Sequence, residues 1–279
     1  MKEPHSHNRK LLSGRHHTAE YSHGKRPAQW AGLSSGSTLG TVAASKHQRD
    51  MNLKPNLRPR FALAVSLLAF VLPAAAAELL AKTTAKAPPA ALDPAIRSLL
   101  APEAVQVTDG GATLFEFWFC AEVPAGAKPE SATKALDALK PITLVGAVAV
   151  IGKQHRTYRD TELPEGLYTM RFSLQPQDGD HLGTADFPYF LVLVPAKLDP
   201  KPDAFANYTQ LVKASGREAP GGHPFILSLR PTSEGETPKL LEPAPEHKSV
   251  RVKAMLKPVG AAQPVPAIFE VVVKGKGKA

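Results

Sequence analysis

The chain has 279 residues, a net charge of +9 and a single cysteine. The charge is concentrated in residues 1–77, which contain 11 lysines and arginines against 3 acidic residues and leave 23 against 22 for residues 78–279. The nearly neutral chain from residue 78 onwards argues against nucleic acid as a partner, and one cysteine excludes an internal disulfide.

The first 50 residues differ in composition from everything that follows. They are polar and contain six histidines at irregular spacing, a composition that cannot bury a core. We expect residues 1–50 to be disordered or not translated, with Met51 as the start of the protein.

Residues 51–77 have the pattern of a signal peptide. The uncharged apolar run 61–72 follows three basic residues and precedes a small-residue cleavage motif at Ala75, Ala76 and Ala77. The run is too short for a comfortable bilayer span, although an uncleaved membrane anchor is the alternative interpretation. We therefore expect Sec-dependent export to the periplasm or the extracellular space, with no stable membrane span after cleavage.

Residues 78–101 are predicted to be a flexible linker because Ala, Lys, Thr and Pro dominate them up to residue 92. The one element expected here is a short helix from Pro94 to Leu100, since Asp93 is a suitable N-cap and proline is favoured at the first helical position. We expect residues 102–279 to form a single domain.

The clearest elements of this domain are two strands joined by a polar loop. Residues 167–175 alternate between apolar and polar side chains, which predicts a half-buried strand with Thr169, Arg171 and Ser173 on its polar side. Residues 187–194 are apolar on both sides and predict an interior strand. We expect these two strands to pair at the centre of the fold.

Short strands separated by Gly and Pro turns account for most of the remaining domain, and the stretch 231–247 is predicted to be mobile. Together the elements predict an all-β fold, an Ig-like antiparallel β-sandwich of about seven or eight strands with one or two short peripheral helices. The further strands are predicted at 104–108, 112–123, 142–151, 224–229, 250–256 and 267–273, and helices at 130–139 and 203–213.

Two residues of the strand 112–123 are chemically distinctive. Glu116 faces an otherwise apolar surface, and we expect it at the sheet rim or paired with an arginine such as Arg171. Cys120 is predicted to be a small buried hydrophobe rather than a nucleophile, because no histidine lies near it in the sequence.

The turn before the strand 167–175 carries Leu163, Pro164, Gly166 and Tyr168. This Leu-Pro-x-Gly-x-Tyr pattern resembles that of uncharacterised bacterial secreted β-sandwich domains. The resemblance covers about half of the chain after the signal peptide. It implies a fold class and export, and it carries no assigned activity.

The polar loop between the two central strands contains a candidate metal site. Asp178, Asp180 and His181 are three possible ligands, with His223 or Asp186 as a fourth, and their oxygen and imidazole groups suit Ca or Zn. Neither the EF-hand pattern nor a pair of histidines at helical spacing is present. We adopt the structural interpretation, in which the aspartates bond to their own loop backbone, and we expect no cofactor, with a divalent cation as the alternative.

The sequence contains neither a Gly-x-Ser-x-Gly nucleophile turn nor a phosphate-binding glycine loop. We predict an exported structural or interaction module of the bacterial cell envelope, without catalytic activity, whose partner is an envelope protein or a glycan. The alternative is a metal-dependent or carbohydrate-directed binding or hydrolytic domain that uses the loop 175–186.

Overall fold

The computed structural model describes residues 78–275 apart from 153–154, 157–160, 177–178, 180, 182–184 and 246. The predicted leader, the start at Met51 and the signal peptide lie outside the described residues. No helix in the described part of the chain is long and apolar enough to cross a membrane.

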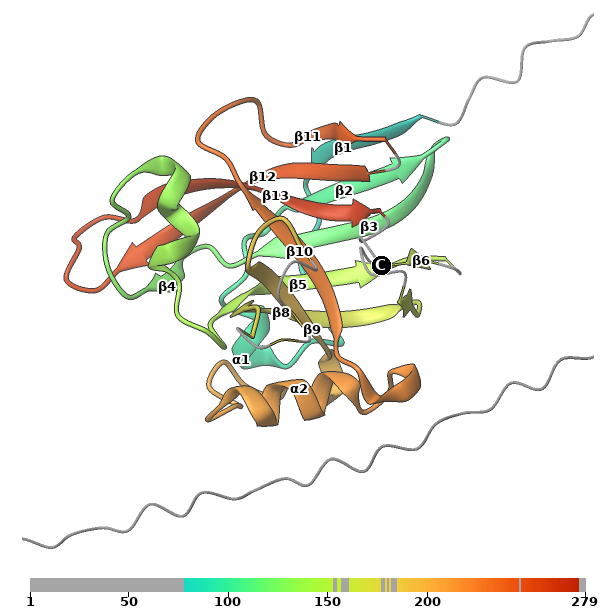
Figure 1. The fold of residues 1–279 in the computed structure, drawn as a ribbon, viewed down its shortest axis with the longest axis horizontal. Helices are drawn as coiled ribbons and strands as arrows, with labels where there is room; N and C mark the ends of the chain where they lie inside the picture. Colours follow the sequence, from blue (N-terminus) through green and yellow to red (C-terminus); the bar gives the residue numbers. More distant parts are fainter. Residues whose placement is uncertain are drawn as a thin grey trace, which may run out of the picture. The chain divides into compact units, whose positions relative to one another are not determined.

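The described chain folds mainly into one large β-sheet (Figure 1). Its strands follow the order β1-β2-β3-β5-β8-β9-β10-β13-β12-β11, all antiparallel to their neighbours, and β4 adds a short parallel pairing to β12. A separate pair is formed by β6 (His155–Arg156) and β7 (Glu162–Leu163). The strands of the large sheet are β1 (Leu79–Thr84), β2 (Ala104–Asp109), β3 (Ala112–Phe119), β4 (Val123–Ala125), β5 (Leu144–Val150), β8 (Gly166–Leu174), β9 (Tyr189–Pro195), β10 (Phe225–Pro231), β11 (Lys239–Ala244), β12 (His247–Pro258) and β13 (Val265–Lys274).

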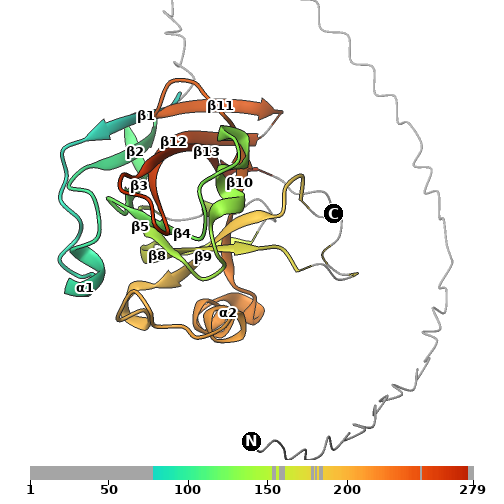
Figure 2. The same ribbon diagram turned by 90° about the vertical axis from the view of Figure 1, so that its left-hand side faces the viewer.

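The sheet curls around one apolar core, so that it forms a half-barrel (Figure 2). Phe119 of β3 and Phe269 of β13 are far apart in the strand order, yet their ring centroids are 6.1 Å apart across the core. The two edge strands, β1 and β11, come to lie beside each other. The all-β prediction is confirmed, but the sandwich of seven or eight strands is wrong, because a twisted sheet of this width buries its inner face by curling instead of stacking on a second sheet.

Both edge strands occupy segments in which no strand was predicted. β1 lies in the segment expected to be a flexible linker and pairs along its whole length with β2. β11 lies within 231–247, which was expected to be mobile, and pairs with β12. Edge strands bury little apolar surface and are commonly rich in charged residues and proline, so their sequences carry little of the periodicity that identifies an interior strand.

The helices are short. The predicted cap at Asp93 is confirmed, since its side chain accepts a hydrogen bond from the Ala95 amide at the start of α1 (Pro94–Arg97). The segment predicted as a helix at 130–139 forms a 3-10 helix at Ala132–Ala138. The helix expected at 203–213 begins later, as α2 (Tyr208–Gly216), and its cap is Asn207 rather than Asp203.

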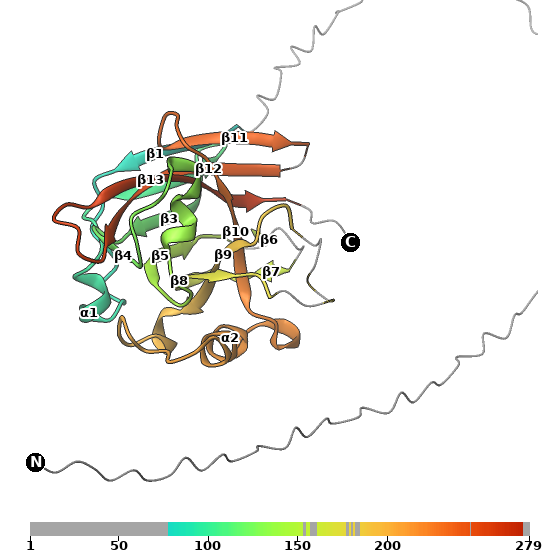
Figure 3. The same cartoon turned by 60° about the vertical axis from the view of Figure 1, so that its left-hand side comes forward.

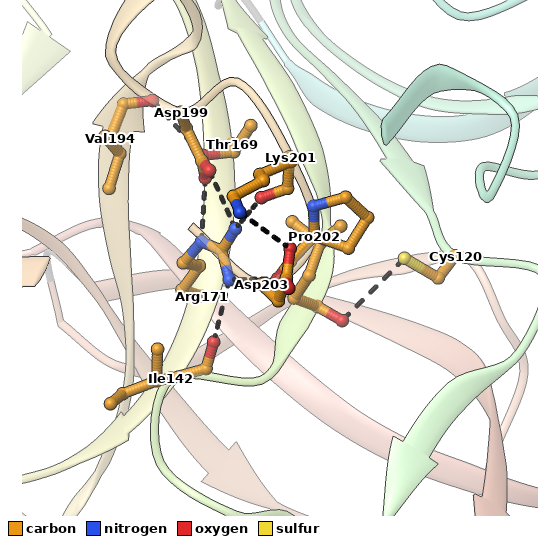
Figure 4. Close-up of polar contacts among 10 residues, drawn as sticks. Cys120, Ile142, Thr169, Arg171, Val194, Asp199, Lys201, Pro202 and Asp203 are labelled. Atoms are coloured by element: carbon orange, nitrogen blue, oxygen red, sulfur yellow. Dashed lines mark hydrogen bonds and ion pairs between the residues drawn. The ribbon is translucent and has the colours of Figure 1, made fainter. Parts of the chain in front are cut away.

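The polar side of β8 is fully buried, contrary to the half-buried strand predicted from its alternation. Arg171 is 1% exposed because the segment after β9 folds over it. Its Nε and Nη2 donate to the two carboxylate oxygens of Asp199, both at 2.7 Å, and Nη1 donates to the carbonyl oxygens of Ile142 and Pro202 (Figure 4). Thr169 donates to the same Asp199 carboxylate at 2.5 Å. The polar residues of this strand therefore hold a covering segment in place.

Glu116 also has a different partner from the one predicted. Lys86, in the segment between β1 and α1, donates to both carboxylate oxygens of Glu116 at 2.6 and 2.7 Å. The arginine proposed for this role, Arg171, is paired with Asp199 instead. Cys120 is 4% exposed, as predicted for a buried hydrophobe, and burial raises the pKa of its thiol to about 12.

The Leu-Pro-x-Gly-x-Tyr turn is a backbone clamp. The Tyr168 hydroxyl donates to the carbonyl oxygen of Pro164 at 2.9 Å, the geometry of the tyrosine corner seen in many β proteins. A Cβ on Gly166 would lie only 3.2 Å from the Tyr168 ring. Burial raises the pKa of Tyr168 to about 12, so the hydroxyl remains a donor at physiological pH.

Removing this hydroxyl while keeping the ring isolates the contribution of the clamp. We expect Tyr168→Phe to lower the free energy of unfolding by about 0.5–1.5 kcal/mol, the usual net value of one intramolecular hydrogen bond. Urea denaturation followed by circular dichroism measures this loss. An unchanged unfolding midpoint and slope would show that the clamp does not contribute to stability.

Candidate ligand-binding cavity

A cavity lies on the outer face of β9 and β10. Alternate residues of β9 point outward, and α2 covers two of them, Val192 and Val194, with Leu211. Phe190 of β9 belongs to the same cluster, and with Ile226 and Ser228 of β10 it lines the floor of the cavity, which has a volume of about 420 Å³. Figure 3 shows α2 on this side of the sheet. The volume lies within the range of small-molecule sites in proteins.

Helix α2 is attached to the sheet at its last turn. The Ser215 hydroxyl donates to the carbonyl oxygen of Leu193 at 2.6 Å and accepts from the Phe225 amide at 2.9 Å, which ties the helix to both β9 and β10. A Cβ on Gly216 would lie 2.2 Å from the Gly222 carbonyl oxygen. The absence of a side chain at Gly216 therefore lets the turn 220–224 fold back on the helix, where Gly221, Gly222, His223 and Pro224 form one rim of the cavity.

A second wall is formed by the end of the loop that precedes β9. The Arg230 guanidinium lies over the Phe187 ring, 5.3 Å from its centroid, and Nη1 donates to Asp186 at 3.1 Å. Arg230 also lies 3.8 Å from Glu270 of β13. These contacts link the wall residue Phe187 to two strands of the sheet.

Tyr189 at the start of β9 is positioned by a contact outside the cavity. Its hydroxyl donates to the Asp137 carboxylate at 2.5 Å. This hydrogen bond and partial burial raise the pKa of Tyr189 to about 12. The phenol therefore remains uncharged at physiological pH, and its ring stacks on Phe172 of the inner core, with ring centroids 6.3 Å apart.

The structure brings together two of the four residues predicted as metal ligands. His181 and His223, 42 positions apart in the sequence, both line this cavity. Asp178 and Asp180 lie outside the described residues. Asp186, the other possible ligand, is paired with Arg230. Within the part of the chain that is described, no group of three or more His, Cys, Asp or Glu residues is arranged to hold a metal ion.

The cavity floor and the helix that borders it were not identified from the sequence as parts of a site. Phe190 and Ile226 were assigned to strands, and Tyr208 and Val212 to the inner face of a helix. One signal was present: residues 187–194 are apolar on both sides, which means that the outer face of that strand is also covered. The sequence could not show that the cover is incomplete.

Comparisons with family models, with curated proteins and with solved structures find no match to this chain.

Proposed function

We propose that residues 78–275 form a binding module that holds a small, largely apolar molecule in the cavity between β9, β10 and α2. The module acts in the cell envelope after export and without catalysis. The observation that carries this proposal is the cavity itself, about 420 Å³ in volume and lined mainly by aromatic and aliphatic side chains.

The cavity is more suitable for such a molecule than for a sugar. A carbohydrate carries a hydroxyl on almost every carbon, and each hydroxyl buried without a partner costs about 1–3 kcal/mol. Much of the described lining is apolar, for example Val212, Ile226, Phe190 and Pro224. The Tyr189 hydroxyl already donates a hydrogen bond to the Asp137 carboxylate.

Filling the cavity should abolish binding. Val212 lines the cavity from α2, and we expect Val212→Trp to place an indole in the space that the ligand occupies. Small uncharged fragments that bind the full-length protein in ligand-observed NMR should lose at least about tenfold in affinity, equivalent to about 1.4 kcal/mol.

Val259→Trp is the matched control, because Val259 is 78% exposed at the turn after β12 and lies outside the cavity lining. The control should bind every fragment as the wild type does, and circular dichroism should show both variants folded. Fragments that bind Val212→Trp with unchanged affinity, or a complete absence of bound fragments, would refute the proposed function.

A further inference from the structure

The cavity that carries the proposed function has a lining that selects among small molecules. Three aromatic side chains contribute to it: Phe187 and Phe190 from β9 and the residues before it, and Tyr208 from α2. Aromatic rings in offset-stacked or edge-to-face contact gain free energy beyond that of the apolar area they bury. The lining is thus matched to a flat, unsaturated ligand.

One of these rings is held in position from outside the cavity. Phe187 lies beneath the guanidinium of Arg230, which is itself paired with Asp186. A ligand ring therefore meets a side chain that is already oriented, so less rotational freedom is lost on binding.

The charges near the cavity are turned toward each other rather than toward its interior. Among the described lining residues there is no aspartate, glutamate, lysine or arginine. Asp186 and Arg230 form an ion pair, and Asp137 accepts the Tyr189 hydrogen bond. A carboxylate or an ammonium group on the ligand would lose its hydration without gaining a fixed opposite charge from any described residue of the lining.

Ser228 provides a polar group that can orient a ligand. Ser228 lies on the cavity floor next to Phe190 in the β9 and β10 register, and its hydroxyl can donate or accept one hydrogen bond. The imidazoles of His181 and His223 are in the lining as well. One or two hydrogen-bonding groups on an otherwise apolar ligand fit this arrangement.

We propose that the ligand of this cavity is a flat, uncharged aromatic molecule that carries a hydrogen-bonding group such as a hydroxyl. The proposal rests on the proposed binding function and specifies the chemical class that the site accepts. Ring contacts with Phe187, Phe190 and Tyr208 provide the selectivity, and Ser228 receives the polar group.

Three probes that share one carbon skeleton test this class: 2-naphthol, its saturated analogue decahydro-2-naphthol, and the anion 2-naphthoate. We expect the full-length protein to bind 2-naphthol at least about tenfold more tightly than either of the other two in isothermal titration or ligand-observed NMR. Tyr208→Leu should reduce the preference for 2-naphthol over decahydro-2-naphthol, because it removes a ring and keeps an apolar side chain.

Val212→Trp should abolish 2-naphthol binding and Val259→Trp should preserve it. Ser228→Leu, which adds bulk at the floor from a different element, provides a second blocked variant if Val212→Trp does not fold. Equal or tighter binding of decahydro-2-naphthol or 2-naphthoate, still blocked by these variants, would overturn the aromatic class and leave the binding function standing. Both proposals fail if no probe and no NMR fragment binds the wild type, or if those that bind also bind the blocked variants.

Discussion

Replacing Arg171 by methionine is expected to lower the free energy of unfolding by about 3–5 kcal/mol, the cost of removing one partner of a buried ion pair. The Arg171 and Asp199 side chains are 1% and 0% exposed. Without the guanidinium, the Asp199 carboxylate would keep only the Thr169 hydroxyl among the side-chain donors described here. The carbonyl oxygens of Ile142, Lys201 and Pro202 would lose their shared donor as well.

Chemical denaturation of the full-length protein measures this loss. Arg217→Met is the matched control, since Arg217 is an exposed residue at the end of α2 and surface changes usually alter stability by less than about 0.5 kcal/mol. The double variant Arg171→Met with Asp199→Leu should recover part of the stability, because it no longer buries an unpaired charge. A single variant as stable as the control would show that the pair does not hold the covering segment.

Truncating Trp118 to alanine is the second change with a large expected effect, about 3–5 kcal/mol of unfolding free energy. Trp118 of β3 is 0% exposed, and its indole Nε1 donates to the Lys86 carbonyl oxygen at 2.8 Å. The change therefore opens a cavity in the core and also releases the segment between β1 and α1. Loss of that hydrogen bond leaves the Lys86 carbonyl oxygen without its indole donor.

Trp118→Phe separates these two contributions, because it keeps an aromatic ring and removes the indole donor. We expect it to lose less stability than the alanine variant, and we expect hydrogen exchange to show faster exchange in β1 for both variants. Equal losses for Phe and Ala would mean that packing contributes little at this position. Unchanged exchange in β1 would show that the edge strand is held independently of Trp118.

The interior hairpin was predictable because its signals are local. The alternation of β8, the apolar run of β9 and the turn chemistry at Leu163 to Gly166 identify two paired strands without reference to the rest of the chain. Gly146 shows a tight contact within the sheet, since a Cβ there would lie 2.2 Å from the Trp118 carbonyl oxygen of the neighbouring strand. Each of these features depends on neighbouring residues or on the volume of one side chain.

The edges of the sheet and the burial of its outer face depend on distant segments. β1 forms because β2 offers it a partner, and β11 forms because β12 does. The burial of Arg171 depends on Asp199, which lies 28 positions further along the chain. No periodicity within β8 distinguishes an arginine that faces solvent from one that faces a covering loop.

The candidate cavity also combines features that are visible in the sequence with features that depend on distant segments. The sequence identified the loop 175–186 and the histidines His181 and His223, because polar residues and glycines stand out against apolar strands. It did not identify the floor, since Phe190 and Ile226 have the composition of any buried strand. Leu211 of α2 packs in one apolar cluster with Phe190, Val192 and Val194 of β9, and Phe190 also lines the cavity beside the helix.

The amino-acid sequence by itself determined the β-rich character of this protein, the strands at its centre, the tyrosine turn that precedes the first of them and the burial of its one cysteine. These features follow from local periodicity, turn chemistry and side-chain volume. Only the tertiary structure decided that the strands form a single curled sheet, that Lys86 and Asp199 neutralise the buried charges, and that two distant histidines line one aromatic cavity. Each of those outcomes depends on which remote segment covers a given face, and a chain's local pattern does not encode that.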